Sequence, residues 1–190
     1  MANSKMKKSR LRATLRGLWW TSKQELIRHC FVCGEPLKKK LVPADKKKRL
    51  VCIDCGHITY LNPRVVAGFI PLTSDGRVAL LRREIEPARG KWSYPAGYQE
   101  IGETVEAAAV RETWEEIRSR ASITGLVGIY SYADAGVVTI VYHGKLKRGE
   151  RPRPGIESQD VKLFRPSQIP WKELAFRSTR HALQDWMKQR

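Results

Sequence analysis

The sequence predicts an α+β fold in which an α/β sandwich follows a small cysteine-bearing unit. Strand-like segments occur in pairs joined by short turns, two or three helical segments accompany them, and all four cysteines lie between residues 30 and 55. Such strand pairs favour a sandwich over a doubly wound parallel sheet. The 190 residues suffice for one medium-sized domain with a small addition.

The first expected strand pair covers residues 65–72 and 77–83, which are rich in β-branched and aliphatic side chains. The intervening Thr-Ser-Asp-Gly is typical of a hairpin turn. Residues 84–97 are expected to form a loop. Further strands are expected at 123–132, 137–146 and 160–166. An amphipathic helix is expected over 177–190, with Ala182, Trp186 and Met187 on one side.

Positive charge is concentrated near the N-terminus. Residues 1–50 carry 15 Lys and Arg but three acidic residues, in a chain of formal net charge +17. We expect residues 1–28 to form a basic extension that attracts phosphate-bearing partners, nucleic acid included, or else a solvated tail. Its leucines and Trp19 fall at helical spacing, which also fits an amphipathic docking helix or an organellar transit segment.

No run of about 18 apolar residues occurs, so no transmembrane helix is expected. There is also no long apolar stretch of the secretory type. The sequence therefore favours a cytoplasmic protein, with organellar targeting by the basic N-terminus as the alternative.

The cysteines form two Cys-x-x-Cys pairs, Cys30 with Cys33 and Cys52 with Cys55. A glycine follows each pair, and glycine readily adopts the positive φ of a tight metal-binding turn. Four thiolates satisfy tetrahedral Zn²⁺ and leave no open position, so the sequence predicts a structural zinc ribbon over residues 29–60. Disulfides or free thiols are the alternatives.

Two features surround these cysteines. His29 and His57 flank the cluster, and we expect both to lie outside the ligand set. The lysine-rich loop between the pairs is typical of a ribbon that binds nucleic acid, and equally of a solvated ribbon tip.

Residues 103–118 predict a helix with one apolar face and one acidic face. The apolar positions expected to share a face are Ala107, Val110, Trp114 and Ile117. Glu112, Glu115 and Glu116 then converge on the other face, although like charges one turn apart destabilise a helix. Converging carboxylates offer the hard oxygen ligands that Mg²⁺ and Mn²⁺ prefer. An acidic, solvent-facing helix is the alternative.

The wider spacing resembles the signature of the Nudix hydrolases, G-x5-E-x7-R-E-U-x-E-E-x-G-U, where U is aliphatic. The first glycine and every charged position are present: Gly97, Glu103, Arg111, Glu112, Glu115 and Glu116. Thr113 replaces the aliphatic residue, and Arg118 replaces the glycine that normally ends the helix in a left-handed cap. We therefore expect the helix to end later or differently, with all metal-binding carboxylates kept.

The resemblance implies a Nudix α/β/α sandwich with a mixed sheet over residues 61–190. Nudix hydrolases cleave a nucleoside diphosphate linked to another moiety, water attacking phosphorus while bound metals neutralise charge and lower the pKa of that water. By the resemblance, Mg²⁺ or Mn²⁺ is held by Glu112 and Glu116, with Glu115 and the backbone carbonyl of Ala96 as further ligands. Arg111 would orient these carboxylates, Glu103 would support Arg111, and Gly97 would contact substrate.

A later acid often adds a ligand or base in this family. Glu157, directly before a predicted strand, is the expected residue, with Asp160 as the second choice and a plain surface acid as the alternative. A four-cysteine ribbon ahead of the domain resembles the NADH pyrophosphatases, where a tyrosine in the place of Tyr60 contacts substrate.

The motif S-Q-P-W-P-F-P-x-S of the NADH pyrophosphatases is absent. Residues 154–176 are more similar to a smaller zinc-ribbon Nudix group that includes a plant chloroplast enzyme acting on FAD and ADP-ribose. We therefore expect a homodimeric hydrolase of a small nucleotide of the FAD, ADP-ribose or NADH class. The alternatives are a nucleic-acid-binding or nucleotide-sensing regulatory protein, and an RNA cap hydrolase.

Overall fold

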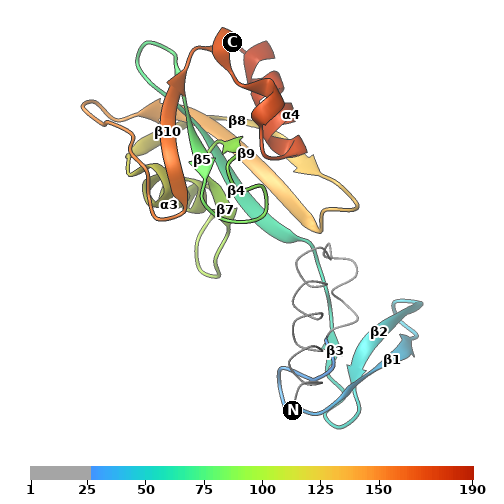
Figure 1. Ribbon diagram of the computed structural model, residues 1–190. Helices are drawn as coiled ribbons and strands as arrows, with labels where there is room; N and C mark the ends of the chain where they lie inside the picture. The colour runs from blue at the N-terminus through green and yellow to red at the C-terminus, as the bar shows by residue number, and fades with distance from the viewer. Residues whose placement is uncertain (1–26) are drawn as a thin grey trace, which may run out of the picture. The chain divides into compact units, whose positions relative to one another are not determined.

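The computed structural model describes residues 27–190, and the predictions for the basic extension lie almost wholly outside this range. The described chain forms two compact units. The first comprises the chain up to Pro63 together with Tyr132–Gly136, and the second comprises Arg64–Ser131 and Val137–Arg190. Figure 1 shows both units in one chain, and each is described by itself below.

The first unit is a three-stranded antiparallel sheet built on the two cysteine turns. Its strands are β1 (Leu37–Val42), β2 (Lys47–Cys52) and β3 (Ile58–Thr59), in the order β1-β2-β3. Gly34 and Gly56, which follow the two cysteine pairs, have φ of 82° and 72°, values that favour glycine. The small sheet thus carries the zinc-ribbon arrangement that the sequence predicts.

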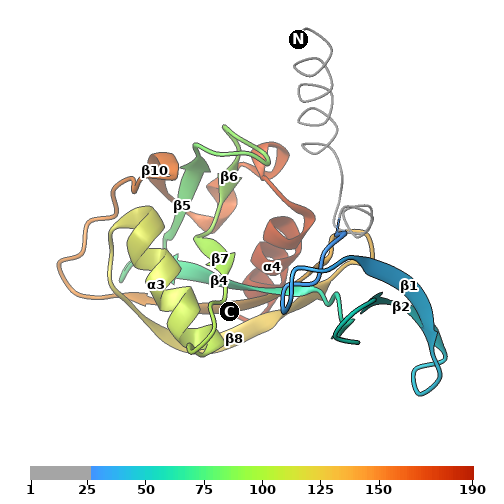
Figure 2. The ribbon, with the colours of Figure 1, turned by 90° about the horizontal axis from the view of Figure 1, so that it is seen from below.

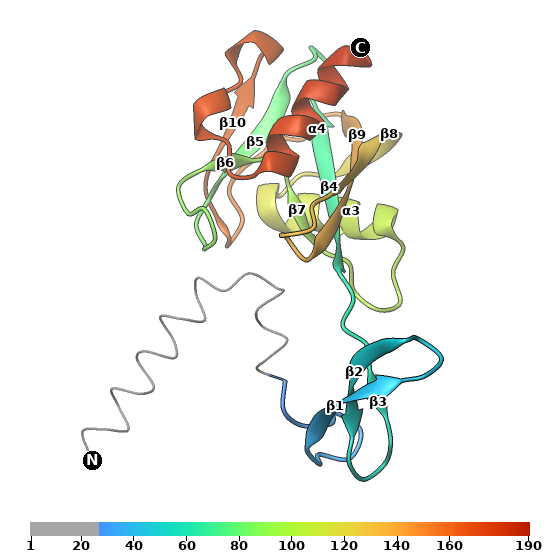
Figure 3. The same ribbon diagram turned by 90° about the vertical axis from the view of Figure 1, so that its right-hand side faces the viewer.

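The second unit is built on a seven-stranded mixed sheet, which Figure 3 shows partly edge-on. Its strands are β4 (Arg64–Leu72), β5 (Val78–Arg83), β6 (Trp92–Ser93), β7 (Ala96–Tyr98), β8 (Ala121–Ser131), β9 (Val137–Leu146) and β10 (Ser158–Phe164). The main path runs β10-β5-β4-β9-β8, with β6 beside β5 and β7 beside β4. The sheet is mixed because β4 and β9 pair in parallel whereas the other pairs are antiparallel.

Two helices, α3 (Val105–Ile117) and α4 (Arg177–Lys188), cover opposite faces of this sheet (Figure 2). Successive side chains of a strand point to opposite faces of the sheet, so each strand offers side chains to α3 on one face and to α4 on the other. Phe69 packs with Ala108 and Ala109 of α3, whereas Tyr130 donates a hydrogen bond to Asp185 of α4. Short 3₁₀ helices at Pro166–Gln168 and Trp171–Glu173 precede α4. The expected α/β/α sandwich is confirmed.

The buried face of α3 differs from the predicted one. The helix buries Ala108, Ala109, Thr113, Glu116 and Ile117, whereas Trp114 is 41% exposed and Ala107 is exposed. The predicted stripe was therefore wrong at Ala107 and Trp114, whereas Ile117 is buried and Val110 is half-buried. Small residues allow the helix to approach the sheet closely, and the Thr113 hydroxyl donates 2.7 Å to the carbonyl of Ala109, so this substitution is accommodated.

Two further details depart from the sequence predictions. Residues 84–97 are not wholly a loop, because β6 and the start of β7 lie within them. On α4, Leu183 is buried with Ala182 and Trp186, whereas Met187 is 38% exposed.

Candidate active site

Arg111 is the centre of a polar network on α3. Its Nη2 and Nε lie 2.7 and 3.1 Å from the two carboxylate oxygens of Glu103, a bidentate ion pair. Nη1 donates to Glu112 at 2.7 Å and to Glu115 at 3.1 Å. Nη2 also donates to the carbonyl of Tyr98 on β7 at 3.1 Å. One guanidinium thus holds three carboxylates together and ties them to the sheet.

The segment before the helix supports this network. Thr104 caps α3, its side-chain oxygen accepting from the Ala107 N–H at 3.1 Å. Glu103 accepts a further hydrogen bond, 2.8 Å, from the backbone N–H of Glu100. Arg111 and this N–H lower the pKa of Glu103, so its carboxylate stays charged opposite Arg111.

Glu116 lies deeper than the other acids and is only 5% exposed. Its Oε2 accepts from the backbone N–H of Ala96 on β7 at 2.9 Å. Burial is the main cause that raises the pKa of Glu116 to about 8. The Ala96 N–H and Arg83 lower this pKa, whereas the neighbouring charges of Glu112 and Glu157 raise it. This carboxyl therefore gains strongly from a nearby cation.

Glu112 belongs to the same electrostatic group. Burial raises its pKa, against the opposing effect of Arg111, and the charges of Glu115 and Glu157 add to the increase. Glu157 is exposed and lies directly before β10, near enough for its charge to act on both Glu112 and Glu116. Asp160, the second choice, instead forms an ion pair with Lys162 at 3.4 Å. The structure therefore brings Glu157 to the cluster.

Two glycines allow the elements of the site to approach closely. A Cβ at Gly97 would overlap the Glu112 carboxylate, and a Cβ at Gly155 would overlap the backbone carbonyl of Glu115. Gly155 also donates to the carbonyl of Glu116 at 2.9 Å, and the buried Ser158 hydroxyl donates to the same oxygen at 2.8 Å. Sequence reasoning missed Gly155 and Ser158, whose one sequence signal is their position beside Glu157.

The helix α3 ends where the Nudix signature places its glycine, although the residue there is Arg118. The helix ends at Ile117, and Arg118 adopts the left-handed conformation (φ 49°, ψ 38°) with its N–H bonded to the carbonyl of Trp114 at 2.9 Å. The prediction of a later or different helix end was therefore wrong. Arg118 takes the conformation of the usual glycine at a cost of about 1–2 kcal/mol.

Comparison with known families agrees with this geometry. The NUDIX domain model matches residues 62–186, and the model described as Nudix N-terminal matches residues 28–61. The chain belongs to the NUDIX family. The resemblance inferred from the glutamate spacing is confirmed, and this Nudix protein is a pyrophosphohydrolase with an N-terminal zinc-ribbon module.

Several relatives extend over most of the Nudix chain. An ADP-ribose pyrophosphatase of Methanocaldococcus jannaschii is 32% identical over 147 residues, which is 75% of this chain and 80% of the relative. A NAD-capped RNA hydrolase NudC of Chromobacterium violaceum is 32% identical over 160 residues, 82% of this chain but only 58% of that protein. The solved structure of a NUDIX hydrolase from Nitrosomonas europaea is 37% identical with a TM-score of 0.81, covering 86% of this chain and 92% of the other.

The four cysteines of this Nudix chain converge as a tetrahedral site requires. Their sulfur atoms all lie within 4.8 Å of one another, with Cys33 at 3.4 Å from both Cys52 and Cys55, and Cys30 at 3.8 Å from Cys55. Four sulfurs at about 2.3 Å from a zinc ion would be about 3.8 Å apart. These residues therefore fit zinc. Neither His29 nor His57 belongs to this group among the described residues.

The aromatic residues near the sheet divide into two kinds. Trp92, Tyr94 and Tyr130 are buried and belong to the core. Tyr98 is 45% exposed and its ring lies 3.9 Å from the Arg64 guanidinium carbon. Tyr60, in the ribbon unit, is 52% exposed and lies 5.2 Å from the Arg49 guanidinium carbon.

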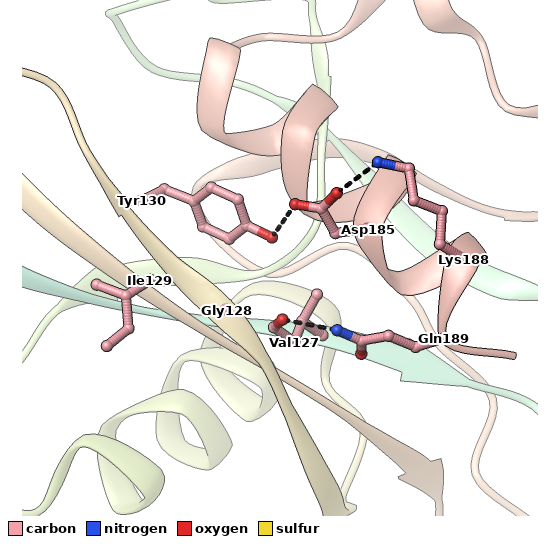
Figure 4. A pocket seen from close by; sticks show the side chains of 7 residues that line it. All are labelled: Val127, Gly128, Ile129, Tyr130, Asp185, Lys188 and Gln189. Carbon is pink, nitrogen blue, oxygen red and sulfur yellow. Dashed lines mark hydrogen bonds and ion pairs between the residues drawn. The ribbon is translucent and has the colours of Figure 1, made fainter.

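A hollow of about 340 Å³ lies elsewhere on the Nudix sandwich, between β8 and α4 (Figure 4). Its polar groups already pair with one another: Asp185 accepts from Tyr130 at 3.1 Å and from Lys188 at 3.0 Å. Gln189 donates to the carbonyl of Val127 at 3.0 Å. No glutamate of the cluster lines this hollow.

Within residues 27–190, no helix is long and apolar enough to cross a bilayer.

Proposed function

We propose that this protein hydrolyses the diphosphate of a nucleoside diphosphate linked to a second moiety, with ADP-ribose as the first candidate substrate. The observation that carries the proposal is the single Arg111 side chain that gathers Glu103, Glu112 and Glu115 beside the buried Glu116. In an acidic helix that only faces solvent, all carboxylates would stay exposed, because a glutamate is rarely buried unless it is paired.

The acids also fit divalent metal ions. We propose that Glu112, Glu115, Glu116, Glu157 and the carbonyl of Ala96 hold Mg²⁺ or Mn²⁺, both of which prefer oxygen ligands. Two observations support this set: the buried Glu116 carboxylate accepts its hydrogen bond from the neutral N–H of Ala96, and the charges of Glu112 and Glu157 both raise its pKa. When bound, such ions neutralise the diphosphate and lower the pKa of the attacking water.

The remaining residues have positioning roles in this proposal. Arg111 holds Glu112 and Glu115 in one orientation, and Glu103 fixes Arg111 from its other side. Gly97 leaves room for the Glu112 carboxylate. Glu157 is exposed and is proposed as a further ligand or as the acceptor of the proton of the attacking water.

The substrate class is drawn from the relatives. The M. jannaschii ADP-ribose pyrophosphatase aligns over 80% of its length, whereas the C. violaceum NudC aligns over 58%. ADP-ribose therefore comes first, followed by NADH and FAD. All carboxylates of the Nudix signature are present, and this favours a hydrolase over a protein that only senses nucleotides. Substrate contact by Tyr60, homodimerisation and a cytoplasmic location stay predictions.

The decisive experiment assays ADP-ribose, NADH, FAD and ATP with Mg²⁺ or Mn²⁺ and measures released AMP. We expect AMP from the first three substrates at unequal rates and no turnover without a divalent ion. Hydrolysis in H₂¹⁸O followed by mass spectrometry then shows which phosphorus water attacks. Glu116→Gln should abolish turnover with the fold intact, and full activity in that variant would refute the proposed metal site.

A further inference from the structure

The hairpin of the ribbon unit is strongly basic. Between Leu37 and Cys52 the sequence has seven lysine or arginine residues and one acid, Asp45. In β1 the four central residues are exposed, and in β2 Lys47 and Lys48 are exposed while Arg49 is half-buried. The catalytic proposal uses none of these side chains, so their charge needs a separate explanation.

The register of the strands divides the charges unequally between the two faces. Residues directly opposite in an antiparallel pair share a face, and alternate residues along a strand share a face. Lys40 pairs with Arg49, Lys38 with Val51 and Val42 with Lys47. One face of the sheet, here called the basic face, therefore carries Lys38, Lys40, Lys47 and Arg49. The other face carries Lys39 and Lys48.

An aromatic ring joins the basic face. Ile58 pairs with Val51, so Tyr60, two residues further on, continues the same face. The contact between Arg49 and the Tyr60 ring, 5.2 Å from guanidinium carbon to ring centre, agrees with this placement. Tyr60 remains 52% exposed. The basic face thus combines four cations with a ring that is partly open to solvent.

This arrangement is costly without a partner. Like charges directly opposite in a sheet are destabilising, and Lys40 lies directly opposite Arg49. Asp45 neutralises only part of the charge, through an ion pair with Arg49 at 2.9 Å. A polyanion that lies along the face would offset the repulsion.

We propose that the basic face of the ribbon binds single-stranded nucleic acid, with the cations contacting phosphates and Tyr60 stacking on a base. Lysine and arginine beside an exposed aromatic ring are the combination that binds unpaired strands, since every base offers a face for stacking. The described ribbon has no helix that could enter a major groove, which disfavours duplex DNA. This inference does not depend on the identity of the hydrolase substrate.

The test compares two double variants of the full-length, zinc-loaded protein. Lys38→Gln/Lys40→Gln removes two charges from the basic face, and Lys39→Gln/Lys48→Gln removes the same charge from the other face. Binding of fluorescein-labelled 15-nucleotide poly(U) is measured by anisotropy between 50 and 300 mM salt. Zinc content and circular dichroism establish that both variants are folded.

We expect the basic-face variant to bind roughly 25-fold more weakly at 0.1 M salt, with its salt slope reduced by about 1.4, because each lost phosphate contact contributes about 0.7 to that slope. The control variant should stay within about threefold of wild type. Tyr60→Ala should weaken binding at least about fivefold, whereas Tyr60→Phe should not.

Three results would overturn the proposal. Equal losses in the two double variants would mean diffuse electrostatic attraction. Unchanged binding in both would place the interaction in the basic residues 1–28. Equal or tighter binding of inorganic polyphosphate or of anionic phosphatidylserine vesicles would mean that bases are not recognised.

Discussion

Replacing Glu116 by glutamine should stabilise the protein in the absence of Mg²⁺ and Mn²⁺, although it removes a proposed metal ligand. Glu116 is 5% exposed, and burial raises its pKa from 4.5 to about 8. Glutamine is the neutral counterpart of the protonated acid, and its carbonyl oxygen can still accept the hydrogen bond of Ala96.

The direction of the pKa shift of Glu116 decides how the stability of the protein depends on pH. Because the pKa is raised in the folded state, folding is favoured when Glu116 is protonated, and this stability is lost as the pH rises from 4.5 towards 8. One pKa unit corresponds to about 1.4 kcal/mol, so the wild type should lose about 3 kcal/mol relative to Glu116→Gln between pH 5 and pH 8. In thermal melts this difference corresponds to roughly 6–12 °C.

Urea unfolding followed by tryptophan fluorescence at several pH values, in buffer free of Mg²⁺ and Mn²⁺, measures this difference. Glu115→Gln is the matched control, since it makes the same chemical change on the same helix at a side chain that is 49% exposed. Added Mn²⁺ should stabilise the wild type and close the gap. A difference between wild type and Glu116→Gln that stays constant from pH 5 to pH 8 would refute the reasoning.

Four other substitutions test the geometry of the site. Arg111→Lys should lower kcat about 10–100-fold, because one ammonium cannot hold three carboxylates, with the exposed Arg120→Lys as the kinetic control. Gly97→Ala should lower kcat, because its Cβ displaces the Glu112 carboxylate. The free energy of unfolding should change little, because the Glu112 side chain can shift. Gly155→Ala should instead destabilise the fold by about 1–3 kcal/mol in urea, because its Cβ meets backbone. Arg118→Gly should stabilise by about 1 kcal/mol with kcat unchanged, and a loss of stability would contradict the strain argued here.

Much of the molecule could be predicted from local sequence. The turn Thr-Ser-Asp-Gly marks the end of β4 and the start of β5, and the cysteine spacing predicts a cluster whose sulfur atoms do converge. The carboxylates were found for a similar reason: Glu112, Glu115 and Glu116 lie on one helix, so their spacing alone places them close together.

The errors arose where a tertiary contact decides the outcome. Trp114 is apolar and was assigned to the core, yet α3 lies so close to the sheet that Ala108, Ala109 and Thr113 fill the contact. The burial of Glu116 could not be read from the helix either. It depends on the Ala96 N–H, twenty positions earlier, which compensates one oxygen of the buried carboxylate.

The anchoring of Glu116 also has a consequence for the order in which the protein forms. The backbone carbonyl of Glu116 accepts hydrogen bonds from Gly155 and Ser158. These two residues leave the ribosome about forty residues after the helix itself. A nascent chain can wind α3 early from local contacts, but the contacts that fix the end of the helix await the later segment. A chain that stops short of residue 155 therefore carries the whole glutamate signature without the contacts that secure Glu116.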